Sequence, residues 1–565
     1  MSSLVVKNFN SYNAQAFARS FVAESIYLYV GRSTGWDIVD VETPEDHEAY
    51  HNVIKQNVLG MVRVLPSDVA TAIDRNDWTS GNRYERYQHA NASVGETNPY
   101  YVLAGYNDRS VYKCIDNNGN SISTSKPYHT NAQPTREHDG YVWKYMYTIP
   151  DLTFKKFATQ NVIPTFVFGR PADDKNSILH IPISANNTTG IGSYYRGLGF
   201  VNTTFAATAV NATIYTTSTA NTPTNQIRVV ADSGLAPMNN YYNNSAFYVT
   251  SGIAAGTIRR VVSSVAETGD TVSNLVLSSA ISGVANGDTF AIGPYVSANT
   301  LELGGGSGFY GYAKTNRYGN VTSISVLSGG KAYSNGYCNV NINGAYSPTT
   351  ASLNDGTGAH AEMVISPSGG SHGYNPQFEL NARYVVVSPQ TTLAKDHENG
   401  TFIGYGNDYR QVGLIRNPID ASTGVGAVGA SYDLRTTVYF ASPTYFDFAE
   451  DEILYDSETP GQETASALVY SVCGDSSDRY LTLTDVVGNL ANGVTLYNRS
   501  GVSATISSAS LQYHRIPNNS DYIPKSPVLS GGITKYTGDI LYHENIAPIK
   551  RRLDQQEEFK FVFEF

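Results

Sequence analysis

The segment HDGYVWKYMYTIP, residues 138–150, places aromatic side chains at alternate positions and ends at a proline. Four rings share one parity: Tyr141, Trp143, Tyr145 and Tyr147. Because successive side chains of a strand point to opposite faces, this spacing predicts a β-strand with one aromatic face. Such a face can hold a sugar, stack on nucleic-acid bases or pack against other protein. We favour protein core or a subunit interface, since tyrosine and tryptophan give large contact areas and are enriched where proteins meet.

The composition extends the β prediction to the whole chain. Of 565 residues, 50 are glycine and 42 are tyrosine, whereas charged residues make up only 15%. Long Ser-, Thr- and Asn-rich stretches between glycines are typical of short strands joined by turns. We therefore expect a β-dominated α+β protein of several domains. The net charge of −11 argues against nucleic acid as the main ligand, because phosphate binding needs a basic surface.

Cysteine usage and hydropathy indicate where the protein is made. Three cysteines, Cys114, Cys338 and Cys473, lie far apart, which gives neither a disulfide framework nor a zinc-site spacing. The N-terminus lacks the basic start and apolar run of a secretory signal, and no stretch of about 18 apolar residues could span a membrane. We expect a soluble protein from a reducing cytosol, without membrane insertion, stabilised by packing and oligomerisation.

The sequence predicts a mixture of helices and strands at both ends of the chain. A helix over 13–24 follows from the spacing of Ala14, Phe17, Ala18, Phe21 and Val22. A second helix over 43–60 begins with Thr43 as N-cap and Pro44 at the first helical position, and a third over 66–77 begins with Ser67. Strands are expected over 25–30, 61–65, 408–418 and 558–565. The last carries phenylalanines at every second position, so other protein must cover that face.

The composition of the chain changes at about residue 172, after which charged residues are rare and helical periodicity is lost. We expect a discontinuous mixed α/β core of residues 1–171, 371–446 and 511–565. Sandwich- or barrel-like β modules are expected to be inserted over 172–300, 301–370 (glycine-rich) and 447–510. Residues 264–292 and 471–498 share one layout of strand, acidic turn, strand and Ala-Asn-Gly turn into a third strand. This layout indicates two copies of one small module.

No motif indicates an active site or a cofactor site. The glycine-rich segment 304–311 lacks the lysine and Ser/Thr of a phosphate loop. His47 and His51 have the i, i+4 spacing that can hold a metal, but Asp46 and Glu48 beside them fit an exposed helix face, so we expect no metal. The segments HDG (138–140) and KDHENG (395–400) combine histidine with acids in turns, where bonds to local backbone are usual. The basic cluster 549–554 is better explained as a strand edge than as a nucleic-acid patch.

Four segments carry a family resemblance: GRSTGWD (31–37), VLGMVRVLPSDVATAIDRNDW (58–78), HDGYVWKYMYTIP (138–150) and TGDILYHENIAPIKRRLDQQEEFKFVFEF (537–565). A fifth, QVGLIRNP (411–418), supports them. Together they resemble the gene-eight baseplate wedge proteins of T4-type phages (myoviruses), in the order found in that family. The resemblance covers both ends of the chain. Residues 172–370 and 447–510 have no counterpart in the family pattern.

The resemblance implies a non-enzymatic structural subunit of a contractile tail, dimeric within each wedge of a six-fold baseplate. It would bind neighbouring wedge proteins and help to transmit the change of shape that triggers sheath contraction, with a tail-fibre contact left open. Its location would be the virion tail, after assembly in the host cytoplasm. An alternative is a trimeric fibre-like or receptor-binding protein whose inserted modules contact host glycans. A third hypothesis is a cell-wall hydrolase, but nothing in the sequence singles out the pair of carboxylates that such an enzyme needs.

Aromatic residues of four segments are the candidates for an interface or for core near the surface. They are Trp36, Trp78, Tyr141, Trp143, Tyr145, Tyr147, Phe559, Phe561, Phe563 and Phe565. Catalytic, cofactor-binding and metal-binding residues are not predicted.

Overall fold

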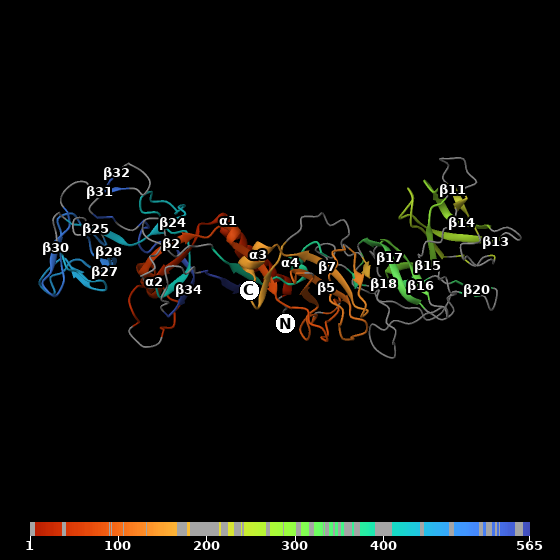
Figure 1. Ribbon diagram of the computed structural model, residues 1–565, viewed down its shortest axis with the longest axis horizontal. Helices are drawn as coiled ribbons and strands as arrows, with labels where there is room; N and C mark the ends of the chain where they lie inside the picture. Colours follow the sequence, from red (N-terminus) through yellow and green to blue (C-terminus); the bar gives the residue numbers. More distant parts are fainter. Residues whose placement is uncertain are drawn as a thin grey trace, which may run out of the picture. The chain divides into compact units, whose positions relative to one another are not determined.

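The computed structural model describes residues 6–36, 41–166, 242–300, 373–389, 409–440, 446–473, 480–507, 532–547 and 558–565, apart from 90, 92, 106, 132, 244, 267–271 and 286, and short segments elsewhere. The chain divides into two compact units: Met1–Thr71 with Arg383–Phe565, here called the terminal unit, and Ala72–Ala382, the central unit. Antiparallel sheets dominate both units, and helices are few and short (Figure 1). The predicted β-dominated α+β class is confirmed.

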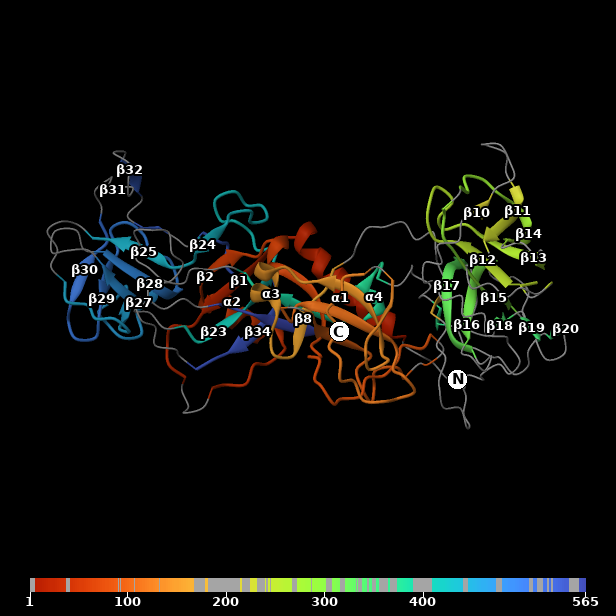
Figure 2. The ribbon, with the colours of Figure 1, turned by 45° about the vertical axis from the view of Figure 1, so that its right-hand side comes forward.

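A five-stranded antiparallel sheet forms the centre of the terminal unit. Its order is β24 (Ser431–Asp433), β2 (Val58–Arg63), β1 (Ile26–Gly31), β23 (Gln411–Arg416) and β34 (Asp539–Asn545). All residues of the middle strand β1 are buried, because both faces of the sheet are covered. Segments from the beginning and the end of the chain therefore lie side by side (Figure 2). The predicted strands at 25–30 and 408–418 are confirmed.

Helix α1 (Lys7–Ala23) covers the phenylalanine face of the C-terminal strand β35 (Phe561–Glu564). Strand β35 pairs in antiparallel fashion with β22 (Tyr384–Val387). The ring of Phe17 lies 5.3 Å from that of Phe563 and 5.4 Å from that of Phe565. The predicted helix is thus confirmed and begins earlier, at Lys7, and the expected cover of the C-terminal strand comes from this chain itself.

Two helix predictions need correction. Helix α2 spans only Glu48–Asn57, with His47 rather than Thr43 as its N-cap. Residues 66–77 form no α-helix: a 3-10 turn, Pro66–Asp68, leads into strand β3 (Val69–Asp74). The carboxylate of Asp68 closes this turn by accepting a hydrogen bond from the Leu65 N–H (2.9 Å). Pairing of β3 with β8 (Val162–Pro164) then overrides the capping signal, as tertiary context commonly does.

The central unit contains a four-stranded sheet in the order β4 (Tyr101–Ala104), β5 (Ser110–Asp116), β7 (Val142–Thr148) and β6 (Thr135–Arg136). Strand β7 confirms the predicted strand, and Pro150 after it begins α3 (Asp151–Phe157). A short helix, α4 (Pro376–Glu379), ends the unit. Strands β9 (Ile178–His180) and β21 (Val364–Ile365) pair with one another.

The other strands form further sheets, the largest of which have nine strands in the central unit and seven in the terminal unit. In the central unit they are β10 (Ile214–Tyr215), β11 (Thr224–Val230), β12 (Ser245–Val249), β13 (Ile258–Ala266), β14 (Val272–Ile281), β15 (Phe290–Thr300), β16 (Ser307–Thr315), β17 (Val321–Lys331), β18 (Cys338–Ile342), β19 (Ala345–Ser347) and β20 (Ser352–Asn354). In the terminal unit they are β25 (Thr436–Tyr439), β26 (Ile453–Tyr455), β27 (Ser466–Cys473), β28 (Tyr480–Val487), β29 (Thr495–Tyr497), β30 (Ser503–Thr505), β31 (Gln512–Arg515), β32 (Tyr522–Lys525) and β33 (Val528–Leu529).

Two of these sheets repeat one topology. Strands β11 to β15, the first module, are ordered β11-β14-β13-β12-β15 in space. Strands β25 to β29, the second module, are ordered β25-β28-β27-β26-β29, which is the same path through five consecutive strands. The predicted internal repeat is therefore confirmed, and it includes the strands β11, β12, β25 and β26, which the sequence comparison did not reach. The domain limits predicted at 172 and 447 remain predictions.

The repeat extends to register and core. In the first module Val261 pairs with Leu277 and the next residue, Val262, is bulged out of the pairing. In the second module Val469 pairs with Leu483 and Tyr470 is bulged in the same way. Equivalent core positions are occupied by Ile227 and Val438, Phe247 and Leu454, Leu275 and Leu481, and Phe290 and Leu496. Shared topology, register and bulge define one module present twice.

Candidate interaction site

The rings of β7 build the core of the central unit. Tyr141 and Trp143 are fully buried and stack with centroids 5.6 Å apart, and Tyr147 is 1% exposed. The Tyr141 hydroxyl accepts a hydrogen bond from the Tyr84 N–H (3.3 Å), and that of Tyr147 donates to the Pro164 carbonyl (3.2 Å). Neither a sugar nor a base can reach these rings in this structure. Of the possible roles of the aromatic face, the structure supports packing in the protein core.

The half-buried Trp78 is tied to the HDG turn. Its indole N–H donates to the Ser123 hydroxyl (3.1 Å), which in turn donates to the Asp139 carboxylate (3.0 Å). The same carboxylate accepts the backbone N–H groups of Thr124 and Ser125 (2.8 and 2.9 Å). The other Asp139 oxygen accepts the N–H of Tyr141 (3.1 Å), so the expected role of HDG in local backbone bonding is confirmed. Trp78 is therefore fixed within the central unit by its hydrogen bond to Ser123. Tyr145 on β7 is also half-buried.

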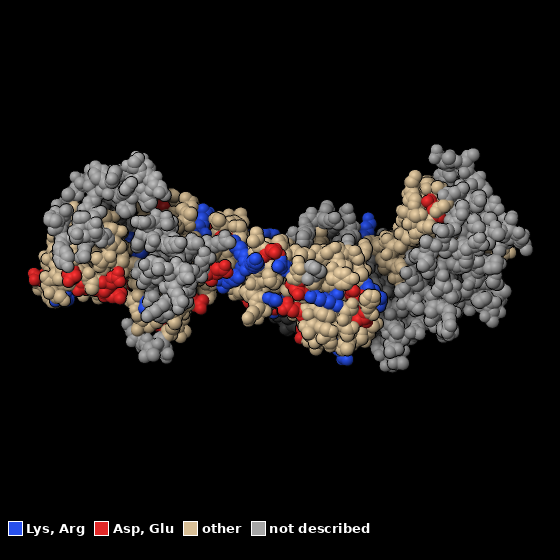
Figure 3. Space-filling model, viewed as in Figure 1, with Lys and Arg blue, Asp and Glu red and all other residues tan. Residues whose placement is uncertain are grey.

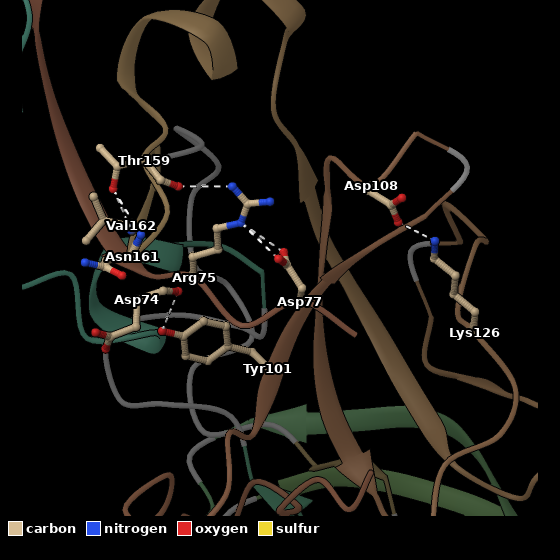
Figure 4. Close-up of polar contacts among 9 residues, drawn as sticks. All are labelled: Asp74, Arg75, Asp77, Tyr101, Asp108, Lys126, Thr159, Asn161 and Val162. Carbon is tan, nitrogen blue, oxygen red and sulfur yellow. Dashed lines mark hydrogen bonds and ion pairs between the residues drawn. The ribbon is translucent and has the colours of Figure 1, made fainter. Parts of the chain in front are cut away.

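Polar contacts also hold the loop after β3 (Figure 4). The Arg75 guanidinium donates to both carboxylate oxygens of Asp77 (3.0 and 3.1 Å) and to the Thr159 carbonyl (3.0 Å). The Tyr101 hydroxyl donates to the carbonyl of Asp74 (3.2 Å). These bonds tie the end of β3 to β4 and to the loop between α3 and β8.

A buried ionic cluster joins α4 to the four-stranded sheet. Lys113 and Lys144 face one another on β5 and β7, and the Lys113 ammonium lies 3.3 Å from the Glu379 carboxylate. Burial lowers the pKa of both lysines, while the negative charge of Glu379 opposes that shift. The other Glu379 oxygen accepts the Gly373 N–H (2.8 Å), and the Lys113 ammonium sits 3.6 Å from the centre of the Tyr87 ring. Since Lys113 is fully buried, the cluster positions α4 and presents no nucleophile to solvent.

The C-terminal candidates are packed to different extents. Phe561 is 7% exposed, and Phe559, Phe563 and Phe565 are half-buried. In the same unit the indole N–H of Trp36 donates to the Ile546 carbonyl (3.3 Å), beneath the Arg32 guanidinium at 4.1 Å from the ring. The candidate rings of the terminal unit are thus already packed against this chain.

The outer side of α1 is an apolar surface that the sequence analysis missed. Phe9 and Tyr12 are 52% and 62% exposed, whereas Val22, which is 73% exposed, lies on another side of the helix. Phe9, Tyr12 and Ala16 lie at i, i+3 and i+7, the spacing of one helix face, and Ala16 is exposed as well. That spacing was visible in the sequence, but only the opposite, buried face of the helix was recognised. Exposed large apolar residues on one face are typical of a surface that binds protein.

Residues 47–51 read His-Glu-Ala-Tyr-His, the pattern of a zinc protease helix, which the sequence analysis did not recognise as such. The structure does not arrange it as a metal site. His47 precedes the helix and caps it by accepting the Tyr50 N–H (3.1 Å), while its other nitrogen meets Glu45 (2.6 Å). His51 lies 3.2 Å from Asp46. Among the described residues, no three His, Cys, Asp or Glu side chains are grouped to hold a metal.

His543 on β34 forms a hydrogen-bonded chain within the terminal unit. Its Nδ1 lies 2.6 Å from the Tyr29 hydroxyl, and its Nε2 lies 2.8 Å from Oδ1 of Asn545. The Asn545 amide nitrogen donates to the Tyr50 hydroxyl (2.8 Å), so its oxygen is the acceptor. Nε2 therefore carries the proton and Nδ1 accepts from Tyr29. Burial lowers the pKa of His543, with His51 acting in the same direction.

This lowered pKa predicts acid sensitivity of the terminal unit. The neutral form of His543 contributes stability above its unfolded-state pKa of about 6.5, and this contribution is lost as the pH falls through the lower folded-state value. We expect the free energy of unfolding to fall below pH 6.5 by less than about 1.4 kcal/mol per pH unit from this residue. His543→Gln should flatten the decline in pH-dependent melting curves, whereas His138→Gln, at an exposed turn, should leave it unchanged. An unaltered pH profile in His543→Gln would contradict the assignment.

The surface of the second module is acidic. The segment FDFAEDEILYDSETPGQETA (446–465) contains many Asp and Glu residues and no Lys or Arg. Figure 3 shows acidic side chains at the left-hand end of the view, where Figure 1 labels β27 and β30. A phosphate backbone would be repelled there, in keeping with the net charge. The segments KDHENG (395–400) and IKRRLD (549–554) lie outside the described residues.

No model of a known protein family matches the chain, and no curated protein matches it either. None of the described helices is long and apolar enough to cross a membrane. The functional conclusion therefore rests on the chain's own residues.

Proposed function

We propose that this protein is a non-enzymatic structural subunit of the baseplate wedge of a contractile phage tail. One observation carries the proposal. Four of the five segments that resemble the gene-eight wedge family, though far apart in sequence, supply the framework of the terminal unit. They contribute β2, β23 and β34, which are three of the four strands that share the five-stranded sheet with β1. They also supply both partners of the bond from the Trp36 indole to the Ile546 carbonyl.

The segments without a family counterpart behave differently. Residues 447–510 fall largely in the second module, and 224–300 form the first, each with a core of its own. A wedge framework with added β modules accounts for this division. The exposed apolar face of α1 supplies a surface for neighbouring subunits, since obligate interfaces are typically apolar and bury more than about 2,000 Å².

Solution mass tests this proposal, because the wedge reading implies a dimer. Light scattering of the full chain across a dilution series is expected to give twice the 61.3 kDa of one chain. Phe9→Asp on α1 is expected to leave the chain folded, because the side chain is exposed, and to weaken the dimer if this face forms it. A stable trimer would favour the fibre-like or receptor-binding alternative instead.

A further inference from the structure

The C-terminal strand β35 lies at the edge of its sheet. Among the described strands only β22 pairs with it, in a register that sets Val562 opposite Val386. An edge strand has a row of backbone N–H and C=O groups that its own sheet leaves unpaired, so it can pair with a strand of another chain. Proline and β-bulges commonly block such pairing. Residues 559–565 contain no proline, and β35 pairs with β22 without a shift of register.

One hydrogen bond shows which backbone groups of β35 point away from its sheet. The Phe565 N–H donates to the carbonyl of Arg383, the residue before β22 (3.0 Å). The backbone groups of successive residues in an antiparallel strand alternate between its two edges, so those of Phe563, two residues earlier, also face β22. The residues whose N–H and C=O groups face the outer edge are Lys560, Val562 and Glu564.

The sequence of this strand is self-complementary about Val562. Residues 559–565 read FKFVFEF, in which the phenylalanines are placed symmetrically and Lys560 mirrors Glu564. In an antiparallel pair of two such strands centred on Val562, this residue faces its own copy, and Lys560 faces Glu564 of the second copy. Two-fold symmetry repeats that ion pair on the other side of the centre. Opposite charges directly across two strands stabilise their pairing, whereas like charges destabilise it.

We propose that two copies of the chain form a dimer by pairing their β35 strands edge to edge, antiparallel and centred on Val562. This inference deepens the proposed function and rests on it for the expectation of a dimer. Each facing pair of outward residues exchanges two backbone hydrogen bonds, as in any antiparallel ladder. The sheet of one copy thereby continues into the sheet of the other, and neither copy keeps an open edge at β35.

The side chains on both faces of β35 suit this pairing. On the inner face the half-buried ring of Phe563 comes to lie beside Phe561 of the second copy, and aromatic pairs across strands are stabilising. On the outer face the Glu564 side chain is 62% exposed and lies 3.0 Å from the Arg383 guanidinium. Lys560 likewise has a contact within its own chain. The ion pairs between the copies therefore add to contacts that each chain already makes.

Val562→Pro in the full chain tests the pairing directly. Proline has no N–H, so the substitution removes the two central hydrogen bonds between the copies and no bond to β22. An edge position with an outward N–H tolerates proline, so the circular dichroism spectrum should not change. Light scattering across a dilution series should show a dimer dissociation constant raised at least about tenfold. The matched control, Val562→Ala, keeps the N–H and should retain the dimer.

Charge reversal provides a second test that leaves the backbone unaltered. Lys560→Glu and Glu564→Lys each place like charges opposite one another in a pair of identical chains, so each variant alone should form a weaker dimer than the wild type. An equal mixture of the two variants restores opposite charges at both positions. Native mass spectrometry of the mixture should therefore show mixed dimers in excess over the random proportion.

The other outcomes separate the strand pairing from the proposed function. A wild-type dimer that Val562→Pro leaves unchanged, with random mixing of the charge variants, would overturn the pairing and leave the proposed function intact, since another surface would then form the dimer. A wild-type chain that stays monomeric at every concentration would overturn the second copy as the occupant of this edge. Absence of the chain from purified tails would overturn the proposed function alone, because the pairing is measured on the isolated chain.

Discussion

Glu379→Gln is expected to lower the free energy of unfolding by about 3–5 kcal/mol, because it removes the carboxylate charge beside the buried Lys113 ammonium. The Glu379 side chain is 3% exposed and that of Lys113 is fully buried. Glutamine has the same shape as glutamate, and its amide oxygen can still accept the hydrogen bond from the Gly373 N–H. The loss of stability therefore measures the effect of the missing charge. Denaturant unfolding at neutral pH, followed by tyrosine and tryptophan fluorescence, measures it.

An exposed ion pair in the same unit provides the control. Lys126 and Asp108 are paired at the surface, with side chains 37% and 66% exposed (Figure 4). Asp108→Asn should cost no more than about 1 kcal/mol, since solvent screens exposed pairs. If Glu379→Gln cost as little as Asp108→Asn, the cluster would not hold α4 electrostatically, and the lysines would have to be neutral or hydrated in solution.

Phe561→Asp is expected to destabilise the terminal unit by more than about 3 kcal/mol, because it removes a buried ring and buries an unpaired carboxylate. Phe561 is 7% exposed and contacts Tyr542, with ring centroids 5.3 Å apart. Its neighbour Val562 on the same strand is 43% exposed and provides the matched control. Val562→Asp should change stability by less than about 1 kcal/mol. Equal melting temperatures for the two variants would mean that β35 is not docked in solution.

The sequence predicted those elements whose periodicity agrees with their final surroundings. Strand β7 has alternating rings and a proline after its end, and β35 has alternating phenylalanines, so both were found. Residues 66–77 were mistaken for a helix because the Ser67 signal is local. The pairing of β3 with β8, about ninety residues away, decides its structure.

Burial was harder to predict than secondary structure. Period-two spacing gives the direction of Tyr141 and Trp143 but not whether other residues cover them, which depends on the distant Tyr84 and Trp78. The Glu379 cluster could not be found for the same reason, since its members come from three separate segments. The internal repeat was detectable from the Ala-Asn-Gly turns, yet the shared bulge and the matching core positions needed strand register to be recognised.

The most direct test of the central claim is the protein content of purified phage particles. Peptide mass spectrometry with isotope-labelled standards is expected to find the chain in intact tails, in a copy number that is a multiple of the six-fold symmetry of a baseplate. Immunogold labelling should place it at the distal end of the tail. If the chain is abundant in infected cells but absent from purified particles, it is not a baseplate subunit.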